Sequence, residues 1–181
     1  SGIDFSGNPV VNGNIINSGN VSSHARASVT TLAHASIDTT SEIFLVSALA
    51  TGNIGVNAVG LNVDINRLNG NLISSGNIDV GAIGNLNTSA NVSGGTNPTA
   101  KAQGEALVGA TGILLDANSV TGNVVSSGNI TVDAYANVMN TAEATGGGDS
   151  STVGANATGI VLARASGLAY FASDLGNISN S

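Results

Sequence analysis

Carboxylates are the side chains of this sequence with the clearest potential for chemistry. Polysaccharide-cleaving enzymes use two carboxyl groups that converge on one face of the protein. Asp79 and Asp133 occupy outward positions of two equivalent predicted strands, but they are two residues out of register. Further acids occupy other places in the sequence: Asp64, Asp116, Asp149 and Asp174. Because no basic side chain lies near Asp79 or Asp133 in the sequence, we interpret the acids as solvated surface residues and predict no catalytic residues and no enzyme.

Metal ligation is the second chemistry that side chains of this sequence could support. A calcium site needs six to eight oxygen ligands. Gly147-Gly148-Asp149 is a single fragment of a calcium-binding repeat, and no tandem GGxGxDxUx run accompanies it. His24 and His34 are ten residues apart, without a third ligand in reach. The sequence therefore predicts no metal or cofactor, and a calcium ion held by a loop is the alternative left open.

Composition excludes further classes of function. The chain has no Cys, which removes disulfides and thiolate chemistry. Its net charge is −7 and its four basic residues are scattered, so we predict no nucleic-acid binding. No apolar run approaches the length of a membrane helix, and we predict no transmembrane segment. The Ser pairs Ser74-Ser75 and Ser126-Ser127 lack the G-x-S-x-G pattern of a nucleophile.

A long internal repeat organises the whole sequence. The stretch Leu68 to Leu86 reappears, with substitutions, as Val11 to Val29 and as Val120 to Val138, and a further copy begins at Leu175. The steps between copies are 57, 52 and 54 residues. Each copy opens with two Gly-Asn pairs, and we interpret these as tight corners because Gly and Asn accept positive φ. The corner residues are Gly13, Asn14, Gly19, Asn20, Gly70, Asn71, Gly76, Asn77, Gly122, Asn123, Gly128 and Asn129.

Strict alternation of apolar and polar residues follows the second corner of each copy. Period two is typical of a half-buried β-strand. Aligning the copies predicts an interior column at each of two apolar positions, made of Ala25, Ala82 and Ala134 and of Val29, Leu86 and Val138. No segment shows a helical stripe of apolar residues with a cap.

Loops and a second shared motif complete each unit. Gly and polar residues predict loops at 38–42, 93–99 and 145–151. The motif Ala-Thr-Gly recurs before an apolar strand, and we align its three copies as equivalent positions: Ala50-Thr51-Gly52, Ala110-Thr111-Gly112 and Ala157-Thr158-Gly159. The repeat units are then approximately 10–66, 67–118 and 119–172, with the start of a fourth at 173–181, in one domain spanning 1–181.

These patterns predict an all-β fold, a right-handed parallel β-helix (β-solenoid) built of about three repeats of 52–57 residues. Dividing each unit into about three turns of 17 to 20 residues gives nine or ten turns and a rod on the order of 45 Å long. The alternative is an antiparallel repeat, in which each unit is one long hairpin with the Gly-rich loops at its tip.

Units of the form G-N-I-x-x-S-G-N-I-x-V, followed by A-T-G-I, resemble the repeats of autotransporter passenger domains and of filamentous-haemagglutinin-like bacterial surface proteins. The resemblance covers Val10 to Ser181. It implies a right-handed parallel β-helix, export to the cell surface and an adhesive or structural use. These families share no catalytic residues that could be carried over to this chain.

The sequence therefore predicts a non-enzymatic structural or adhesive protein of the bacterial cell surface. A solenoid end leaves backbone groups unpaired, so we expect self-association head to tail, or continuing repeats of a longer chain. The expected assembly end consists of Leu175, Gly176, Asn177 and Ile178. The alternative is a β-helix that binds or degrades glycans. Tyr135, which faces outward beside Asp133, is the one aromatic residue placed for it.

Overall fold

The computed structural model describes residues 1–37, 45–146 and 152–181. In these residues the secondary structure consists of β-strands, and every strand pair is parallel. The predicted all-β parallel solenoid is confirmed, the antiparallel alternative is wrong, and the hand of the coil stays a prediction. The strands are β1 (Ile3–Phe5), β2 (Val10–Asn12), β3 (Ile15–Asn17), β4 (Val21–Ser36), β5 (Leu45–Asn69), β6 (Leu72–Ser74), β7 (Ile78–Ser93), β8 (Asn97–Val120), β9 (Val124–Ser126), β10 (Ile130–Thr145), β11 (Gly154–Leu175) and β12 (Ile178–Asn180).

Three parallel sheets form the walls of the coil. Strands β5, β8 and β11 form sheet A, and β1 and β2 both pair with β5. Sheet B has the order β12-β9-β6-β3, and sheet C has the order β10-β7-β4. We call β3, β4 and β5 coil 1, β6, β7 and β8 coil 2, and β9, β10 and β11 coil 3. Each coil therefore contributes one strand to each sheet.

The size of one coil corrects the sequence-based geometry. Val21 pairs with Ile78 and Ile78 with Ile130, so the neighbour of a residue lies one whole repeat away. One unit is thus a single turn, where we predicted three turns of 17 to 20 residues. Alternation gives the face of a strand but not the turn length, because Thr, Ala and Gly continue the pattern through sixteen residues in β7 without a corner.

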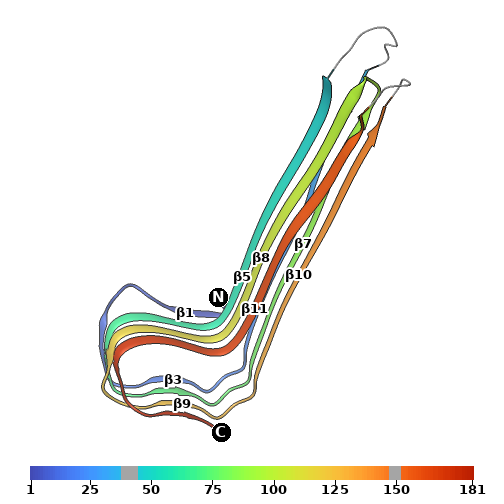
Figure 1. Cartoon of the computed structure of the whole chain (residues 1–181). Coiled ribbons are helices and arrows are strands. Elements are labelled where there is room, and N and C mark those ends of the chain that lie inside the picture. Colours follow the sequence, from blue (N-terminus) through green and yellow to red (C-terminus); the bar gives the residue numbers. More distant parts are fainter. Residues whose placement is uncertain (38–44, 147–151) are drawn as a thin grey trace.

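The coils are long and flat, and they bend once (Figure 1). In the straight part, which we call the arm, sheet C packs face to face with the first part of sheet A. The sixteen residues of β4, β7 and β10 give the arm a length of about 50 Å at roughly 3.3 Å per residue. In the bent part, the foot, sheet B lies opposite β1 and the last part of sheet A (Figure 1). The long dimension therefore runs across the stacking direction, unlike that of the predicted rod.

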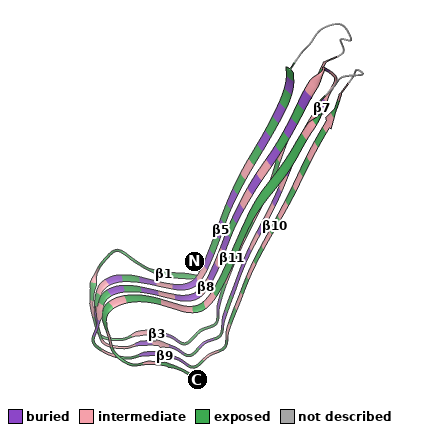
Figure 2. Cartoon of the chain, viewed as in Figure 1, coloured by how far each residue is buried: buried purple, intermediate pink, exposed green. Residues whose placement is uncertain are grey.

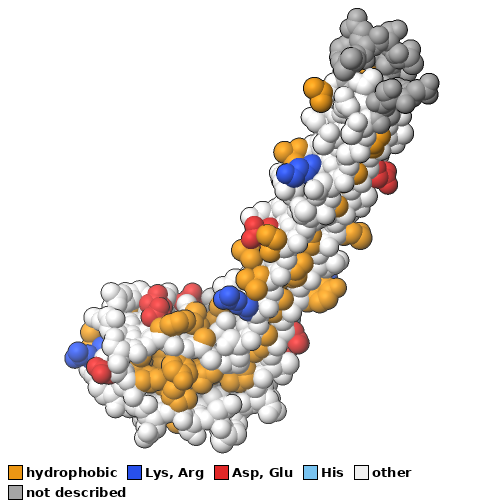
Figure 3. All heavy atoms as spheres, in the orientation of Figure 1, with side chains coloured by type: hydrophobic (Ala, Val, Ile, Leu, Met, Phe, Trp, Pro, Cys, Tyr) orange, Lys and Arg blue, Asp and Glu red, His pale blue; other side chains and the backbone are white. Residues whose placement is uncertain are grey.

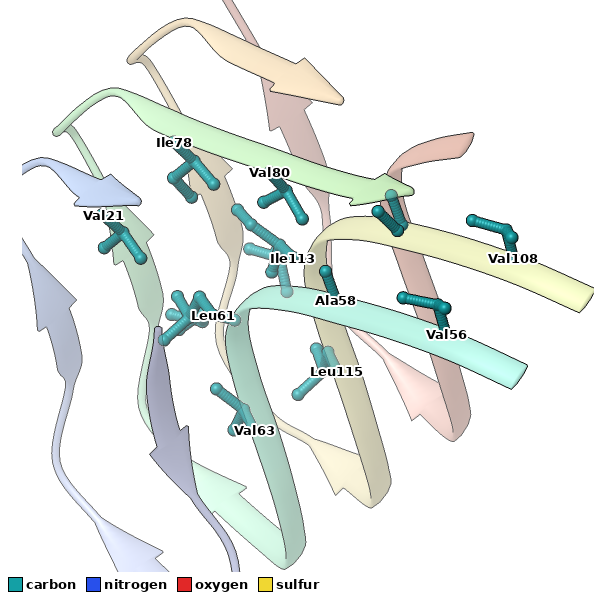
Figure 4. Close-up of a cluster of buried hydrophobic side chains, with 14 of the residues drawn as sticks. Val21, Val56, Ala58, Leu61, Val63, Ile78, Val80, Val108, Ile113 and Leu115 are labelled. Atoms are coloured by element: carbon teal, nitrogen blue, oxygen red, sulfur yellow. The ribbon is translucent and has the colours of Figure 1, made fainter. Parts of the chain in front are cut away.

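The core lies between the sheets, and alternation along each strand fills it (Figure 2). In β7, for example, Val80 and Ala82 are fully buried, while Ile83 on the outer face is only half-buried. Where the arm meets the foot, Leu61, Ile78 and Ile113 pack together with Val21 and Val80 (Figure 4). A second cluster of small residues, mainly Ala and Val, fills the upper arm.

The described strand ends that flank the predicted loops, such as Ser93 and Asn97, lie at the far end of the arm (Figure 1). The predicted loop 38–42, between β4 and β5 of coil 1, lies outside the described residues, as does most of 145–151. The predicted loop 93–99 is shorter than expected, because β7 ends at Ser93 and β8 begins at Asn97. Gly94 and Gly95 make this turn with φ of +85° and +76°. These angles lie in the region that favours glycine.

The alignment of the Ala-Thr-Gly motif is wrong for its second copy. Ala50 pairs with Ala102, and Ala102 with Ala157, so the equivalent of Gly52 is Gly104. Gly112 instead belongs to a second glycine column, with Gly60 and Gly167, where β5, β8 and β11 switch the face they bury. At this switch two consecutive residues are buried, Gly60 with Leu61 in β5 and Gly112 with Ile113 in β8.

Candidate functional site

The paired Gly-Asn corners are the most regular feature of the molecule, and glycine is required there for a different reason from the predicted one. Of the six corner glycines in the coils only Gly13 has a φ in the left-handed region, at +130°. A Cβ on Gly70 would overlap with the carbonyl oxygen of Gly13, and one on Gly76 with that of Gly19. The same overlap recurs one coil further on, at Gly122 and Gly128. Glycine therefore lets adjacent coils approach each other.

The corner asparagines form two ladders that run from coil to coil. The side-chain oxygen of Asn14 accepts from the backbone N–H of Asn71 at 2.9 Å, and that of Asn71 accepts from Asn123 at 2.8 Å. The second ladder has the same direction. The side-chain oxygen of Asn20 accepts from the N–H of Asn77 at 3.0 Å, and that of Asn77 accepts from the N–H of Asn129 at 3.1 Å. Each coil thus offers a side-chain acceptor to the next coil and a backbone donor to the previous one.

The structure places the two predicted interior columns in the lower arm. Ala25 and Ala134 are the partners of Ala82 on either side, and Val29 and Val138 are those of Leu86. Ala82 is completely buried, while its two partners are half-buried. The middle coil alone is covered by a further coil on both sides, and this accounts for the difference.

The predicted assembly end continues the stack into the foot. Leu175 pairs with Val120 as the last residue of β11. Gly176 lies against the carbonyl of Gly122, and the carbonyl of Asn177 accepts from the N–H of Val124 at 2.9 Å. Ile178 then begins β12 opposite Val124. These four residues therefore repeat the corner geometry of the preceding coils.

Asp79 and Asp133, the acids on equivalent predicted strands, do not lie opposite each other. Asp79 pairs with Thr131 and Asp133 with Gly81, which is the two-residue offset that the sequence indicates. Asp64 and Asp116, which occupy other places in the unit, are direct strand partners on the outer face of the foot. The described residues contain no group of three or more His or acidic side chains arranged to hold a metal ion. The Gly147-Asp149 fragment lies outside the described residues.

His24 has two polar neighbours that sequence spacing did not predict. Its Nδ1 lies 3.2 Å from Ser22 Oγ, and its Nε2 lies 3.7 Å from Asp79 Oδ2. Nucleophilic catalysis by such a trio also needs preorganised oxyanion donors in a water-excluded site. Here the His24 and Asp79 side chains are 59% and 57% exposed on the outer face of sheet C. The trio is a surface contact between coils 1 and 2. His34 is exposed in another part of the same strand.

A polar layer crosses the interior of the arm and separates the two apolar clusters. Thr88 is completely buried, and its hydroxyl donates to the side-chain oxygen of Asn140. The Asn140 amide donates in turn to the carbonyl of Thr158. Gly104 faces this layer, and a Cβ on it would lie 2.6 Å from Asn140 Oδ1. Thr88 at an inward position was the sequence signal for this layer.

Comparison with protein-family models, with curated proteins and with solved structures finds no match to this chain. The resemblance to bacterial surface repeats therefore stays a prediction. None of the described residues belongs to a helix long and apolar enough to cross a membrane.

Proposed function

We propose that this chain is a non-enzymatic structural or adhesive protein of the bacterial cell surface, which extends by end-to-end stacking of coils. The observation that carries the proposal is the uniform parallel register from coil to coil. Among the described strands, β10, β11 and β12 each pair with a neighbour on one side only. Open backbone groups on a sheet edge are a template for another strand.

The asparagine ladders give this stacking a direction. Asn129 in coil 3 donates its N–H to the side-chain oxygen of Asn77 in coil 2. Asn77 donates in the same way to Asn20 in coil 1. Because every step of the ladder has the same donor-to-acceptor direction, the two ends of the stack differ, and this favours head-to-tail addition, which does not close on itself.

The foot supplies a register for a second copy. Strand β1 pairs with β5 at Leu61, and the equivalent of Leu61 in β11 is Leu168. Strand β3 pairs with β6, and the last strand in that sheet is β12. In a neighbouring copy, β1 would therefore add to β11 and β3 to β12, which continues the apolar columns of the foot.

Substitution at Asn180 tests the stacking. Because the N–H of Ser181 donates to Ser126, the alternation of a parallel strand directs the N–H of Asn180 to the open side of β12. Asn180→Pro removes this donor, while Asn180→Ala keeps it. We expect wild type and Asn180→Ala to form filaments in electron micrographs at high concentration, and Asn180→Pro to remain small with an unchanged circular dichroism spectrum.

Two results would contradict the proposal. One is a wild-type chain that sediments as a discrete monomer at every concentration. The other is a proline variant that assembles as readily as the alanine variant, which would show that the edge of β12 takes no part in assembly.

A further inference from the structure

The outer face of sheet A carries a groove that crosses the arm. Its floor is the backbone at Gly52, Gly104 and Gly159, one residue from each coil, whose Cα positions face the interior. The groove has a volume of about 430 Å³, which is within the usual range for small-molecule sites, about 300–1,000 Å³. It spans three strands, or roughly 10 Å, which is about the length of a disaccharide.

The groove is walled by outward side chains from all three coils. These are Thr51, Gln103 and Thr158 on one wall and Asn53, Glu105 and Ile160 on the other. Within the described part of the chain, the amides of Asn53 and Gln103 and the carboxylate of Glu105 make no hydrogen bond or ion pair with other side chains. The corner asparagines, in contrast, are bonded to one another. Three planar polar groups thus lie together in the groove without a side-chain partner.

The backbone beneath the groove limits what can bind. Gly104 lies in β8, whose two neighbours β5 and β11 already pair with it throughout this part of the arm. A peptide that binds by adding a strand needs open backbone groups, so it has no partner at the groove floor. Only the side chains are free to bond, which favours a ligand that is covered with hydroxyl groups.

The charge of the groove and its apolar side chain further limit the kind of ligand that can bind. Glu105 carries the one charge in the groove, and Lys101 lies two residues before Gln103 on the same face of β8. Charged side chains are sparse on the face of the arm in Figure 3. Ile160 is 62% exposed beside the polar groups and offers an apolar surface to the C–H face of a sugar ring.

We propose that this groove binds a short stretch of a neutral glycan, with Gln103 and Glu105 bonding its hydroxyl groups. The biological role of this binding rests on the proposed adhesive function, whereas the binding itself does not. Binding at the groove and assembly through β12 involve different residues and are measured separately.

Cellotetraose, maltotetraose and chitotetraose are the probes for this site. We expect at least one of them to shift the backbone amide NMR signals of Gly52, Gly104 and Gly159 on titration. Removing a hydrogen-bonding side chain by Gln103→Ala or Glu105→Ala should weaken this binding by about tenfold or more. Asn137→Ala is the control, since Asn137 is an exposed side chain of β10 in the opposite sheet, and its binding should match that of wild type.

The inference is overturned if none of the three probes shifts these signals, or if both groove variants bind as tightly as the control. Electron micrographs of the same preparations distinguish the two proposals. Filaments without glycan binding would remove the groove proposal and leave the stacking proposal standing.

Discussion

At the scale of single residues, the distance between coils decides which side chain is tolerated. A corner glycine has a neighbouring glycine carbonyl where its Cβ would be, but only if another coil lies on that side. Gly76 has such a neighbour in Gly19, whereas no atom lies within 4 Å of a Cβ built on Gly19. The same sequence motif is thus under different constraint in coil 1 and in coil 2.

Gly76→Ala should lower the free energy of unfolding by about 1–3 kcal/mol, because its methyl group overlaps with the backbone of coil 1. Gly19→Ala is the matched control. Its φ lies outside the left-handed region, so we expect it to change stability by at most about 0.5–1 kcal/mol, in the stabilising direction. Urea denaturation of both variants checks the difference, and equal destabilisation would mean that coil contact is not the reason for glycine.

The alanine column should show the same dependence on position. Ala82→Leu inserts three carbon atoms into a completely buried site and should cost about 1–3 kcal/mol or more. Ala134→Leu should cost less, because Ala134 is half-buried. Thermal melting of the two variants tests this order, and a variant Ala82→Leu that melts like wild type would show that the assigned register is wrong.

The sequence located these corner residues but not the reason for them. Gly-Asn spacing marks a bend wherever positive φ is usual, and at Gly13 that reason holds. At Gly70 and Gly76 the constraint comes from a residue one repeat earlier in the chain. A contact between coils cannot be read from a motif until the strand register is known.

At the scale of elements, β1 is held to the foot by few contacts. It has three residues, and Asn62 donates to the Asp4 carboxylate at 3.1 Å. Hydrogen bonds from Ser6 and then from Asn62 hold the pKa of Asp4 below its usual value of 3.8. Bonds to the ionised form therefore contribute to the pairing of β1 with β5.

The sign of the pH effect follows from this lowered pKa. The contribution of Asp4 is fully present well above pH 3.8, and it is lost as the pH falls through the lower pKa of the folded state. We expect the protection factors of the β1 amides against hydrogen exchange to fall over that acidic range, and this fall to be absent in Asp4→Asn. The same fall in Asp4→Asn would assign the effect to other groups.

The polar layer of the arm is a second element that can be tested. Thr88→Val keeps the shape of the side chain but removes the buried hydroxyl that donates to the half-buried Asn140 oxygen. Losing a hydrogen bond of this kind costs about 0.5–1.5 kcal/mol. Chemical denaturation should show a loss of this size, whereas a stabilised variant would mean that Asn140 finds another partner.

Sequence patterns predicted the strands better than their pairing. Alternation correctly places Ile78, Val80 and Ala82 on the inner face of β7. The alignment of the Ala-Thr-Gly motif failed at Ala110-Thr111-Gly112, because two glycine columns eight residues apart carry similar motifs. The spacing between the motif copies could have revealed the misalignment. Steps of 60 and 47 residues between the aligned motifs disagree with the steps of 52 to 57 found at the corners.

At the scale of the whole molecule, the central claim is that one sequence repeat forms one coil. This claim explains why the molecule is a bent blade of a few stacked coils rather than a long narrow rod. It also sets the surfaces used in both proposals, since the edges that stack and the groove across sheet A exist only in this register. Leu32 and Ser89 are strand partners on the outer face of sheet C, one full repeat apart.

Disulfide trapping in this cysteine-free chain tests the claim most directly. Neighbouring strands bring Cα atoms to about 4.8 Å, within the range that a disulfide bridges. The pair Leu32→Cys with Ser89→Cys should form an intramolecular disulfide under mild oxidation, seen as one cross-linked peptide by mass spectrometry. Leu32→Cys with Thr51→Cys should not, because Thr51 points outward from sheet A on the other side of the arm. A cross-link between positions 32 and 51 with none between 32 and 89 would contradict the one-coil repeat.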